Sequence, residues 1–337
     1  MFFGGGSGTE DDPYVISKIE HLDNIRYHLS GYFVLVSDLD FNDDSCYLDP
    51  SKKVFFTTGD GWRPIINDSY DNLFSGVFDG QGHVISNLFI NRPSSNLVGL
   101  FGCLRARVVK DIGLVNVNVS GDWCVGGLVG EMYYGSVSGC YASCSVSGDD
   151  AVGGLFGYIW NVNVSGCYAT GSVSGDKRVG GFVGLLYNST VSNSYSRGNI
   201  TRISGYETSL GGFVGFCFCS RIFNSYSTGS VRWHSPPHPV DKGFAGWVSE
   251  DCVMSGDFWD MDSSSQTSTA GNAVGKTTSE MKTKSTFTDA GWNFTNVWGI
   301  SSSINDGYPY IKNCTGIKIG TEDGSKKASK GTKYMWL

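Results

Sequence analysis

Short hydrophobic runs separated by glycine and serine recur at a fixed interval in the middle of the chain. Each unit begins with Val or Leu, followed by Gly-Gly, two hydrophobic residues and a third Gly. The first three copies start 27 residues apart and the fourth follows after 31, with starting residues Val125, Val152, Val179 and Leu210. Weaker copies begin at Val98 and Phe244. Self-similarity at a fixed period of this length indicates a repeat architecture.

Two further hydrophobic runs complete each period, as in Ser136–Ala142 and Ser145–Gly148. Runs of four to six residues rich in Val, Tyr and Phe favour strands, because a helix needs ten or more uninterrupted residues. A chain that coils so that each unit pairs with the preceding one satisfies its backbone hydrogen bonds along the coil axis. The sequence therefore predicts an all-β protein, a right-handed parallel β-helix (solenoid) with coils of about 27 residues.

Equivalent residues of successive coils should stack into ladders, because neighbouring strands lie about 4.8 Å apart. The Tyr ladder contains Tyr141, Tyr168, Tyr195 and Tyr226. The position before it forms a second ladder of Cys140, Cys167, Ser194 and Ser225. Neighbouring positions on a strand face opposite ways, so one ladder should enter the core and the other should face outward. The sequence leaves open which ladder does which.

An open solenoid end exposes an unpaired strand edge, so both ends should be covered. At the N-terminus, Ser17 and Glu20 predict a capping box that opens an amphipathic helix ending near Gly31. At the C-terminus we expect a short helix over residues 278–284 and an aromatic cap around Trp292 and Trp298. The predicted organisation is a leader and capping helix (1–31), irregular first coils (32–97), the repeats (98–262), the C-terminal cap (263–314) and a polar tail (315–337). Within the first coils, residues 42–73 are predicted to be mostly loop.

The repeat unit resembles a known family. Val-Gly-Gly-Leu-Val-Gly at residues 125–130, with the following Cys-Tyr-Ala and Ser-Val-Ser runs, is similar to the GLUG repeat of bacterial and archaeal surface proteins, adhesin-like proteins and some virus tail proteins. The flanks at residues 8–16, 74–83 and 257–292 extend the resemblance over residues 4–312, and residues 317–330 resemble the ends of some phage tail proteins. The resemblance implies surface display and binding, and it brings no catalytic motif.

Charge and composition narrow the function classes. The chain has 25 Lys and Arg against 32 Asp and Glu, a formal charge of −7, which does not suit nucleic-acid binding. No stretch has the roughly 18–20 uninterrupted apolar residues that a membrane helix needs. The start, Met1-Phe2-Phe3 before three glycines, lacks the regions of a signal peptide, which favours a chain trimmed of its leader or a virion protein. Ten cysteines leave the redox compartment open.

Several residues are candidates for chemistry. No cofactor is expected, although Asp257, Asp260 and Asp262 offer oxygen ligands for calcium or a carboxylate pair for sugar chemistry. Cys140 and Cys167, one coil apart, could form a disulfide, although a free stacked pair is preferred. Asp79 and His83 could act as acid and base but more simply shape a turn. Zinc binding by Cys217 and Cys219 would need further ligands, for which the insertion offers His234 and His238.

The expected function is a non-catalytic binding or structural rod, displayed on a cell surface or as a virion tail protein. Its expected partners are a host-surface glycan or protein receptor and other virion or surface-layer proteins, with a homo-oligomer left open. If the Tyr ladder faces outward, its rings could form a platform on which sugars stack. The alternative is a polysaccharide lyase or glycoside hydrolase with carboxylates in a side groove, and ice binding ranks last. The small number of basic residues across the repeats counts against a lyase acting on an acidic substrate.

Overall fold

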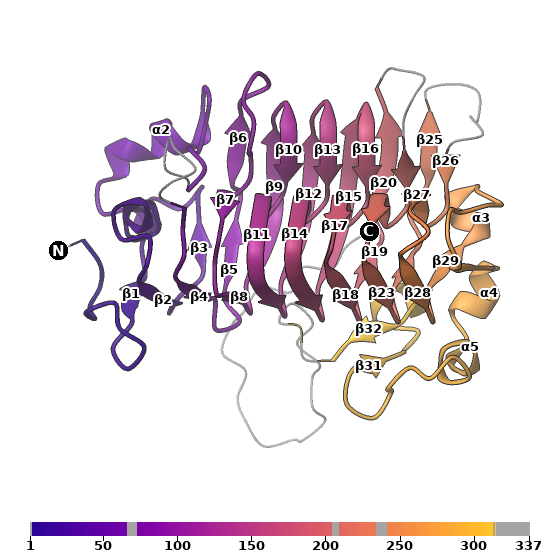
Figure 1. The fold of residues 1–337 in the computed structure, drawn as a ribbon. Coiled ribbons are helices and arrows are strands. Elements are labelled where there is room, and N and C mark those ends of the chain that lie inside the picture. Colours follow the sequence, from indigo (N-terminus) through magenta and orange to yellow (C-terminus); the bar gives the residue numbers. More distant parts are fainter. Residues whose placement is uncertain (1, 66–72, 204–208, 234–240, 313, 315–337) are drawn as a thin grey trace.

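The computed structural model describes residues 2–65, 73–203, 209–233, 241–312 and 314. The chain forms a parallel β-solenoid whose coils follow one another from the N-terminal to the C-terminal end (Figure 1), which confirms the predicted fold class. Its strands stack into three parallel sheets, named here sheets A, B and C, that run along the axis. Each repeat contributes to all three sheets, but its hydrophobic runs cross the turns between them: residues 125–130 run from sheet C into sheet A, Ser136–Ala142 runs from sheet A into sheet B, and Ser145–Gly148 ends the sheet B strand.

The sheets have the following strands. Sheet A contains β1 (Tyr14–Ile16), β2 (Tyr32–Leu35), β4 (Val77–Asp79), β7 (Phe101–Leu104), β8 (Val108–Lys110), β11 (Val129–Ser138), β14 (Phe156–Ser165), β17 (Val183–Tyr187), β18 (Thr190–Ser192), β22 (Val214–Phe218), β23 (Arg221–Phe223), β27 (Ala245–Val248) and β28 (Val253–Ser255). Sheet B contains β3 (Leu39–Asp40), β5 (Val84–Ser86), β6 (Phe89–Asn91), β9 (Gly113–Ser120), β12 (Tyr141–Ser147), β15 (Tyr168–Gly175), β19 (Tyr195–Ser196), β20 (Asn199–Arg202), β24 (Tyr226–Ser227), β25 (Val231–Trp233), β29 (Phe258–Asp260) and β30 (Val274–Lys276). Sheet C contains β10 (Trp123–Gly126), β13 (Asp150–Gly153), β16 (Lys177–Gly180), β21 (Leu210–Gly211) and β26 (Asp241–Lys242).

The sequence period sets the pairing register. From β12 to β15 every paired residue is 27 positions further along the chain, as in Tyr141 opposite Tyr168 and Ser147 opposite Ser174. Val125, Val152, Val179 and Leu210, the first residues of the repeat units, are all fully buried in one continuous core. One repeat is therefore one coil.

The Gly-Gly pair of each unit is a packing requirement. A Cβ atom on Gly153 would lie 2.1 Å from the carbonyl oxygen of Phe156 and 2.7 Å from the amide nitrogen of Gly184. Both contacts are with backbone atoms, which cannot move aside without disturbing the coil. The chain turns so tightly between sheets C and A that only glycine fits there.

The predicted helix is present at the N-terminal end, and its apolar residues Ile19, Leu22 and Ile25 are fully buried. The helical segment is short, with α1 at Ile19–Asp23 and a 3₁₀ turn at Asn24–Tyr27, and α1 has no side-chain cap. The Glu20 carboxylate instead accepts hydrogen bonds from the backbone of Leu48 and Asp49, at 2.7 and 3.0 Å, so the predicted capping box is wrong. Gly4 and Gly5 bond to Val15 and so occupy the outer edge of β1.

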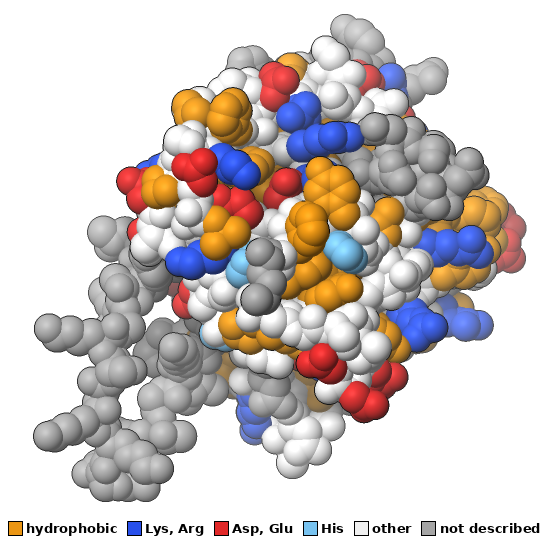
Figure 2. Space-filling view, turned by 90° about the vertical axis from the view of Figure 1, so that its left-hand side faces the viewer, with side chains coloured by type: hydrophobic (Ala, Val, Ile, Leu, Met, Phe, Trp, Pro, Cys, Tyr) orange, Lys and Arg blue, Asp and Glu red, His pale blue; other side chains and the backbone are white. Residues whose placement is uncertain are grey.

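Hydrophobic side chains also remain on this end. Phe2, Tyr27, Leu48 and Phe55 are all more than half exposed. Figure 2 views the molecule from this end and shows hydrophobic side chains gathered around its centre. Part of the loop predicted over 42–73 is helical, with 3₁₀ turns at Asp44–Cys46 and Pro50–Lys52 and helix α2 at Lys53–Thr57.

The C-terminal cap starts from the last coil with α3 (Met261–Ser264) and β30. The helix expected over 278–284 is divided into α4 (Thr278–Met281) and α5 (Lys284–Thr288). Thr277 and Glu280 form a complete capping box at α4. The cap continues through a 3₁₀ turn (Asn305–Gly307) and the antiparallel pair β31 (Trp298–Gly299) and β32 (Tyr310–Ile311), which lies beside the solenoid in Figure 1.

Candidate functional site

The Tyr ladder lies on the outer face of sheet B. Its rings stack almost in parallel, with centroids 4.9, 4.7 and 5.0 Å apart from Tyr141 to Tyr226. The next residue along each strand, such as Ala142, belongs to the solenoid core, so the tyrosines point away from it. The stacking predicted from the sequence is present, and the Tyr ladder is the one that faces outward.

The outward-facing ladder is nevertheless buried. Tyr168, the most accessible of the four, is only 8% exposed. The rings share one hydrophobic cluster with the C-terminal cap, whose contributors include Phe287, Trp292, Trp298, Tyr308, Ile311 and Cys314. Tyr226 fixes the cap further, because its hydroxyl donates to the Pro309 carbonyl at 2.6 Å and accepts from Asn305 at 2.8 Å. The ladder is therefore no exposed platform for sugars in this structure, and its rings attach the cap to the solenoid.

The members of the ladder that contains Cys140 and Cys167 are linked by hydrogen bonds from the backbone amide of one residue to the side chain of the next. The Cys140 amide donates to the Cys167 sulfur at 3.4 Å, and the Cys167 amide donates to the Ser194 hydroxyl at 3.3 Å. The same contact continues through Ser225 and ends on Asp257, whose Oδ1 accepts from the Ser225 amide at 2.9 Å. Both cysteines are buried free thiols. Asp257 is thus the last member of a structural ladder, and burial raises its pKa to about 8.

The other two candidate calcium ligands are engaged by protein donors. Asp260 accepts from the backbone of Asp262 and Ser263, both at 3.0 Å, and also from the hydroxyls of Thr278 and Tyr308. Asp262 accepts from the Thr278 amide at 2.8 Å. These carboxylates join β29 to the cap helices. Across the described ranges, no group of three or more His, Cys, Asp or Glu side chains is placed to hold a metal ion.

The remaining sequence candidates are dispersed. Asp79 pairs with Lys110 at 2.9 Å, while His83 Nδ1 lies 3.0 Å from Asp38, so the two do not share a site. Cys219 Sγ is 3.8 Å from a carboxylate oxygen of Asp251. His234 and His238, which the zinc hypothesis requires, lie outside the described residues.

The outer face of sheet A carries aromatic residues that the sequence reasoning missed. We define the sheet A aromatic face as the aromatic residues of two columns, in each of which residues of successive coils pair with one another. One column runs from Tyr133 through Trp160 and Tyr187 to Phe218, and the other from Tyr158 past Leu185 to Phe216 and Trp247. The first column repeats at intervals of 27, 27 and 31, the same spacing as the Tyr ladder, so the signal was present in the sequence.

The rings of this face remain partly accessible, unlike the Tyr ladder. Six of the seven aromatic side chains have intermediate exposure, and Trp247 at the C-terminal end is 39% exposed. Trp160 meets Tyr187 edge to face at 6.0 Å, whereas Phe216 stacks on Trp247 at 4.2 Å. Edge-to-face packing turns some ring faces away from their neighbours, which makes them available to a flat apolar ligand.

Polar groups border these rings. Asn161 and Asn188 follow Trp160 and Tyr187 in the chain, and their side chains are hydrogen-bonded to each other. Glu131 is buried beside Tyr133 and accepts from its hydroxyl, and burial raises the pKa of this carboxyl. The face therefore combines aromatic surface with amide and hydroxyl groups and little exposed charge.

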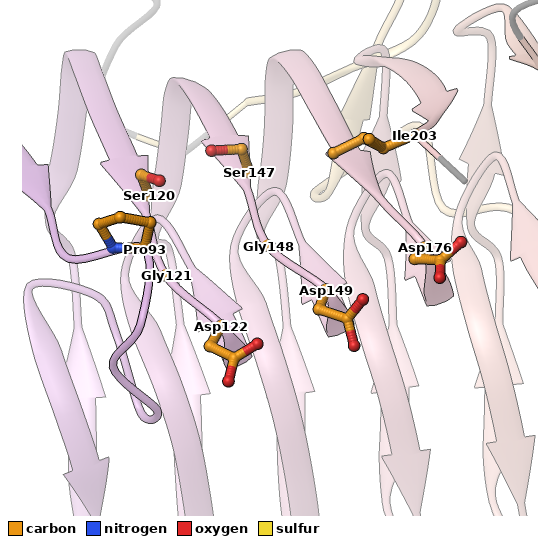
Figure 3. A pocket seen from close by; sticks show the side chains of 9 residues that line it. All are labelled: Pro93, Ser120, Gly121, Asp122, Ser147, Gly148, Asp149, Asp176 and Ile203. Carbon is orange, nitrogen blue, oxygen red and sulfur yellow. The ribbon is translucent and has the colours of Figure 1, made fainter. Parts of the chain in front are cut away.

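A groove runs along the junction of sheets B and C (Figure 3). It has a volume of about 280 Å³, and three successive coils contribute residues of a repeated Ser-Gly-Asp segment to it. Figure 3 shows the carboxylates of Asp122, Asp149 and Asp176 in a row, with Pro93 and Ile203 as apolar walls. Lys177 partly neutralises this row through Asp149, at 3.4 Å. The groove is open and acidic.

Comparison with known proteins supports the repeat assignment. Residues 121–147 and 175–201 match the model of the GLUG motif. The chain is also 40% identical over 142 residues to a Gly-rich protein of Evansella cellulosilytica, described as a candidate membrane protein, and 36% identical over 130 residues to halomucin of Haloquadratum walsbyi.

These matches are partial. They cover 39% and 37% of this chain, and they span 14% and 1% of the two relatives. A crystal structure of a Bacteroides ovatus protein, described as a candidate immunoglobulin A1 protease, shares the fold with a TM-score of 0.56 over 93% of this chain and 96% of the other, at 20% identity. No helix in the described part of the chain is long and apolar enough to cross a membrane.

Proposed function

We propose that this GLUG-repeat chain is a non-catalytic rod displayed on a surface, where it binds glycan through the sheet A aromatic face. The observation that carries the proposal is the contrast between two aromatic columns with the same spacing. The Tyr ladder is covered by the cap, whereas the column of Tyr133, Trp160, Tyr187 and Phe218 stays partly open on sheet A. The names of the two partial relatives, a membrane protein and a halomucin, support display at a surface.

The chemistry of the face suits a neutral sugar chain. The apolar face of a pyranose ring packs on an aromatic ring, and amides and hydroxyls at the border bond the sugar hydroxyls. The coils repeat at about the strand spacing, so equivalent rings form a row along the axis that an extended polysaccharide can follow. The net charge of −7 disfavours an acidic glycan.

The test is an array of surface glycans incubated with the purified chain and with single variants. Tyr187→Ala and Trp247→Ala remove rings from the middle and the end of the face, and each should weaken retention by roughly two- to tenfold, since one ring–ring contact contributes about 0.5–1.5 kcal/mol. Tyr27→Ala removes an exposed aromatic ring at the N-terminal end and is the matched control. Equal retention by all three variants would show that the face does not bind.

A second candidate function follows from the groove of Figure 3. Its row of carboxylates would supply the acidic side chains that a polysaccharide lyase or glycoside hydrolase with a side-groove site requires. The same array, read for release of shortened chains, separates the two functions: release abolished by Asp149→Asn favours the enzyme, and retention without release favours the rod. Display on a virion tail is the alternative to display on a cell, and copurification with particles distinguishes them.

A further inference from the structure

Two cysteines from adjacent coils meet at the C-terminal part of the solenoid. Cys217 lies on β22 with its side chain in the core, and Cys252 lies in the turn between β27 and β28. Their sulfur atoms are 3.4 Å apart, although 35 residues separate them in the sequence. This spacing differs from the 27-residue period, so the repeat pattern alone does not pair them.

Cys252 occupies the end of a second ladder of turn residues. The Val162 amide donates to the Ser189 hydroxyl at 3.0 Å, the Ser189 amide to the Ser220 hydroxyl at 3.0 Å, and the Ser220 amide to the Cys252 sulfur at 3.4 Å. The serines also donate to the carbonyl two residues earlier, at 2.7 Å in both cases. Cys252 instead directs its sulfur to Cys217 and to the Ser249 hydroxyl, at 3.3 Å.

We propose that Cys217 and Cys252 form an intramolecular disulfide when the protein meets a disulfide oxidant such as glutathione disulfide. Cys252 is a half-buried residue, and its sulfur attacks one sulfur of glutathione disulfide and releases one glutathione. The Cys217 thiol then gives up its proton and attacks the Cys252 sulfur, which releases the second glutathione. Two protein thiols are oxidised to one disulfide, and one glutathione disulfide is reduced to two glutathiones.

The surroundings favour Cys252 as the attacking thiol. The hydrogen bond from Cys217, together with donors from Ser249 and Ser220, lowers the pKa of Cys252 to about 6. The thiolate is the nucleophile in thiol–disulfide exchange, so these hydrogen bonds favour Cys252 over Cys217 as the attacking group. The hydrogen bond to Cys252 and burial raise the pKa of Cys217, which stays protonated until its partner has reacted.

Cys140 and Cys167 lack these features. Both are fully buried, and each sulfur donates to the carbonyl two residues earlier, at 3.2 and 3.3 Å. Neither thiol is open to an oxidant. The cysteine pair for which coil spacing permits a disulfide is thus less suited to oxidation than the pair that tertiary packing brings together.

The cross-link would tie two coils of the sheet A aromatic face. Cys217 stands between Phe216 and Phe218, and Cys252 closes the coil that carries Trp247. The loop closed by the disulfide contains the insertion with His234 and His238, and closing a loop of this length restricts the unfolded chain. The inference does not depend on glycan binding, because its readout is the cross-link itself.

The test uses the full chain after incubation with glutathione disulfide. Thiols are counted by alkylation under denaturing conditions, and linked peptides are identified by mass spectrometry. The expected result is eight free thiols instead of the ten in the sequence, with one peptide joining Cys217 to Cys252. Reduction with dithiothreitol should lower the Tm of the oxidised wild type by several degrees and leave the Tm of Cys252→Ser unchanged.

Two controls keep the outcome decisive. Cys140→Ser places in the ladder the residue already present at positions 194 and 225, and this variant should form the cross-link as the wild type does. Cys219→Ser tests the neighbouring thiol and should also leave the cross-link intact. Ten free thiols, a glutathione adduct that persists on Cys252, or a link between Cys219 and Cys252 would each overturn the proposal.

Discussion

Replacing Trp298 by alanine tests whether the cap is held by the Tyr ladder. Trp298 is fully buried, and its ring centroid lies 6.3 Å from that of Tyr195, 6.2 Å from that of Tyr226 and 4.4 Å from that of Trp292. Its indole nitrogen donates to the side-chain oxygen of Asn193 at 3.2 Å. The residue therefore joins the cap to two members of the ladder and to the turn that precedes them.

The expected loss of stability follows from burial. Truncating a fully buried Trp to Ala costs about 3–5 kcal/mol, through lost transfer free energy and the cavity that remains. The hydrogen bond to Asn193 contributes about 1 kcal/mol within this range, because water can reach Asn193 once the ring is gone. Trp247→Ala is the matched control, since Trp247 is 39% exposed and mainly loses its stack on Phe216, which is worth about 0.5–1.5 kcal/mol.

The assay combines urea unfolding with hydrogen exchange. The free energy of unfolding should fall by at least about 1.5 kcal/mol more in Trp298→Ala than in Trp247→Ala. Because the cap can open without the solenoid, exchange should accelerate first in β15, β19 and β24, which carry the covered tyrosines. Equal losses in the two variants, or unchanged exchange in those strands, would refute the account of the cap.

Three further changes test other parts of the structure. Asp257→Asn should flatten the dependence of stability on pH. Burial raises the pKa of Asp257 to about 8 in the folded protein, against about 4 in the unfolded chain, so between these pH values the folded wild type holds a proton that the unfolded chain has lost. The stability of the wild type should therefore fall as the pH rises from about 4 to about 8, by up to about 1.4 kcal/mol per pH unit. Parallel melting-temperature profiles of wild type and variant would contradict this. Gly153→Ala should cost more than about 2 kcal/mol in urea unfolding because its Cβ overlaps backbone, whereas Ala at the exposed Ser145 should cost under about 0.5 kcal/mol. Neither calcium nor EDTA should change the Tm, because Asp260 already accepts four protein donors, and a calcium-dependent rise would show that a cation site exists.

Much of the candidate site follows from register. A residue's position within the 27-residue period fixes the ladder it joins, because each strand pairs with the equivalent strand of the next coil. The same rule would have found the sheet A column that begins at Tyr133 and Trp160, since its spacing matches that of the Tyr ladder. Which ladder is accessible does not follow, because that depends on chain far outside the repeat.

The sequence by itself determined the solenoid, its coil length, its stacked ladders and the tight Gly-Gly turns, because these rest on contacts between equivalent positions of neighbouring coils. Tertiary structure alone decided which of them are exposed or reactive. Tyr226 is hydrogen-bonded to Pro309, which lies 83 residues further along the chain, and Asn193 is hydrogen-bonded to Trp298, 105 residues further along. Glu20 bonds the backbone near Leu48 in place of a capping box, and Cys217 meets Cys252 out of register. The repeat pattern determines how each coil pairs with the next one. The contacts that the C-terminal cap makes with the outer surface of the solenoid join residues far apart in the sequence, so the repeat period does not predict them.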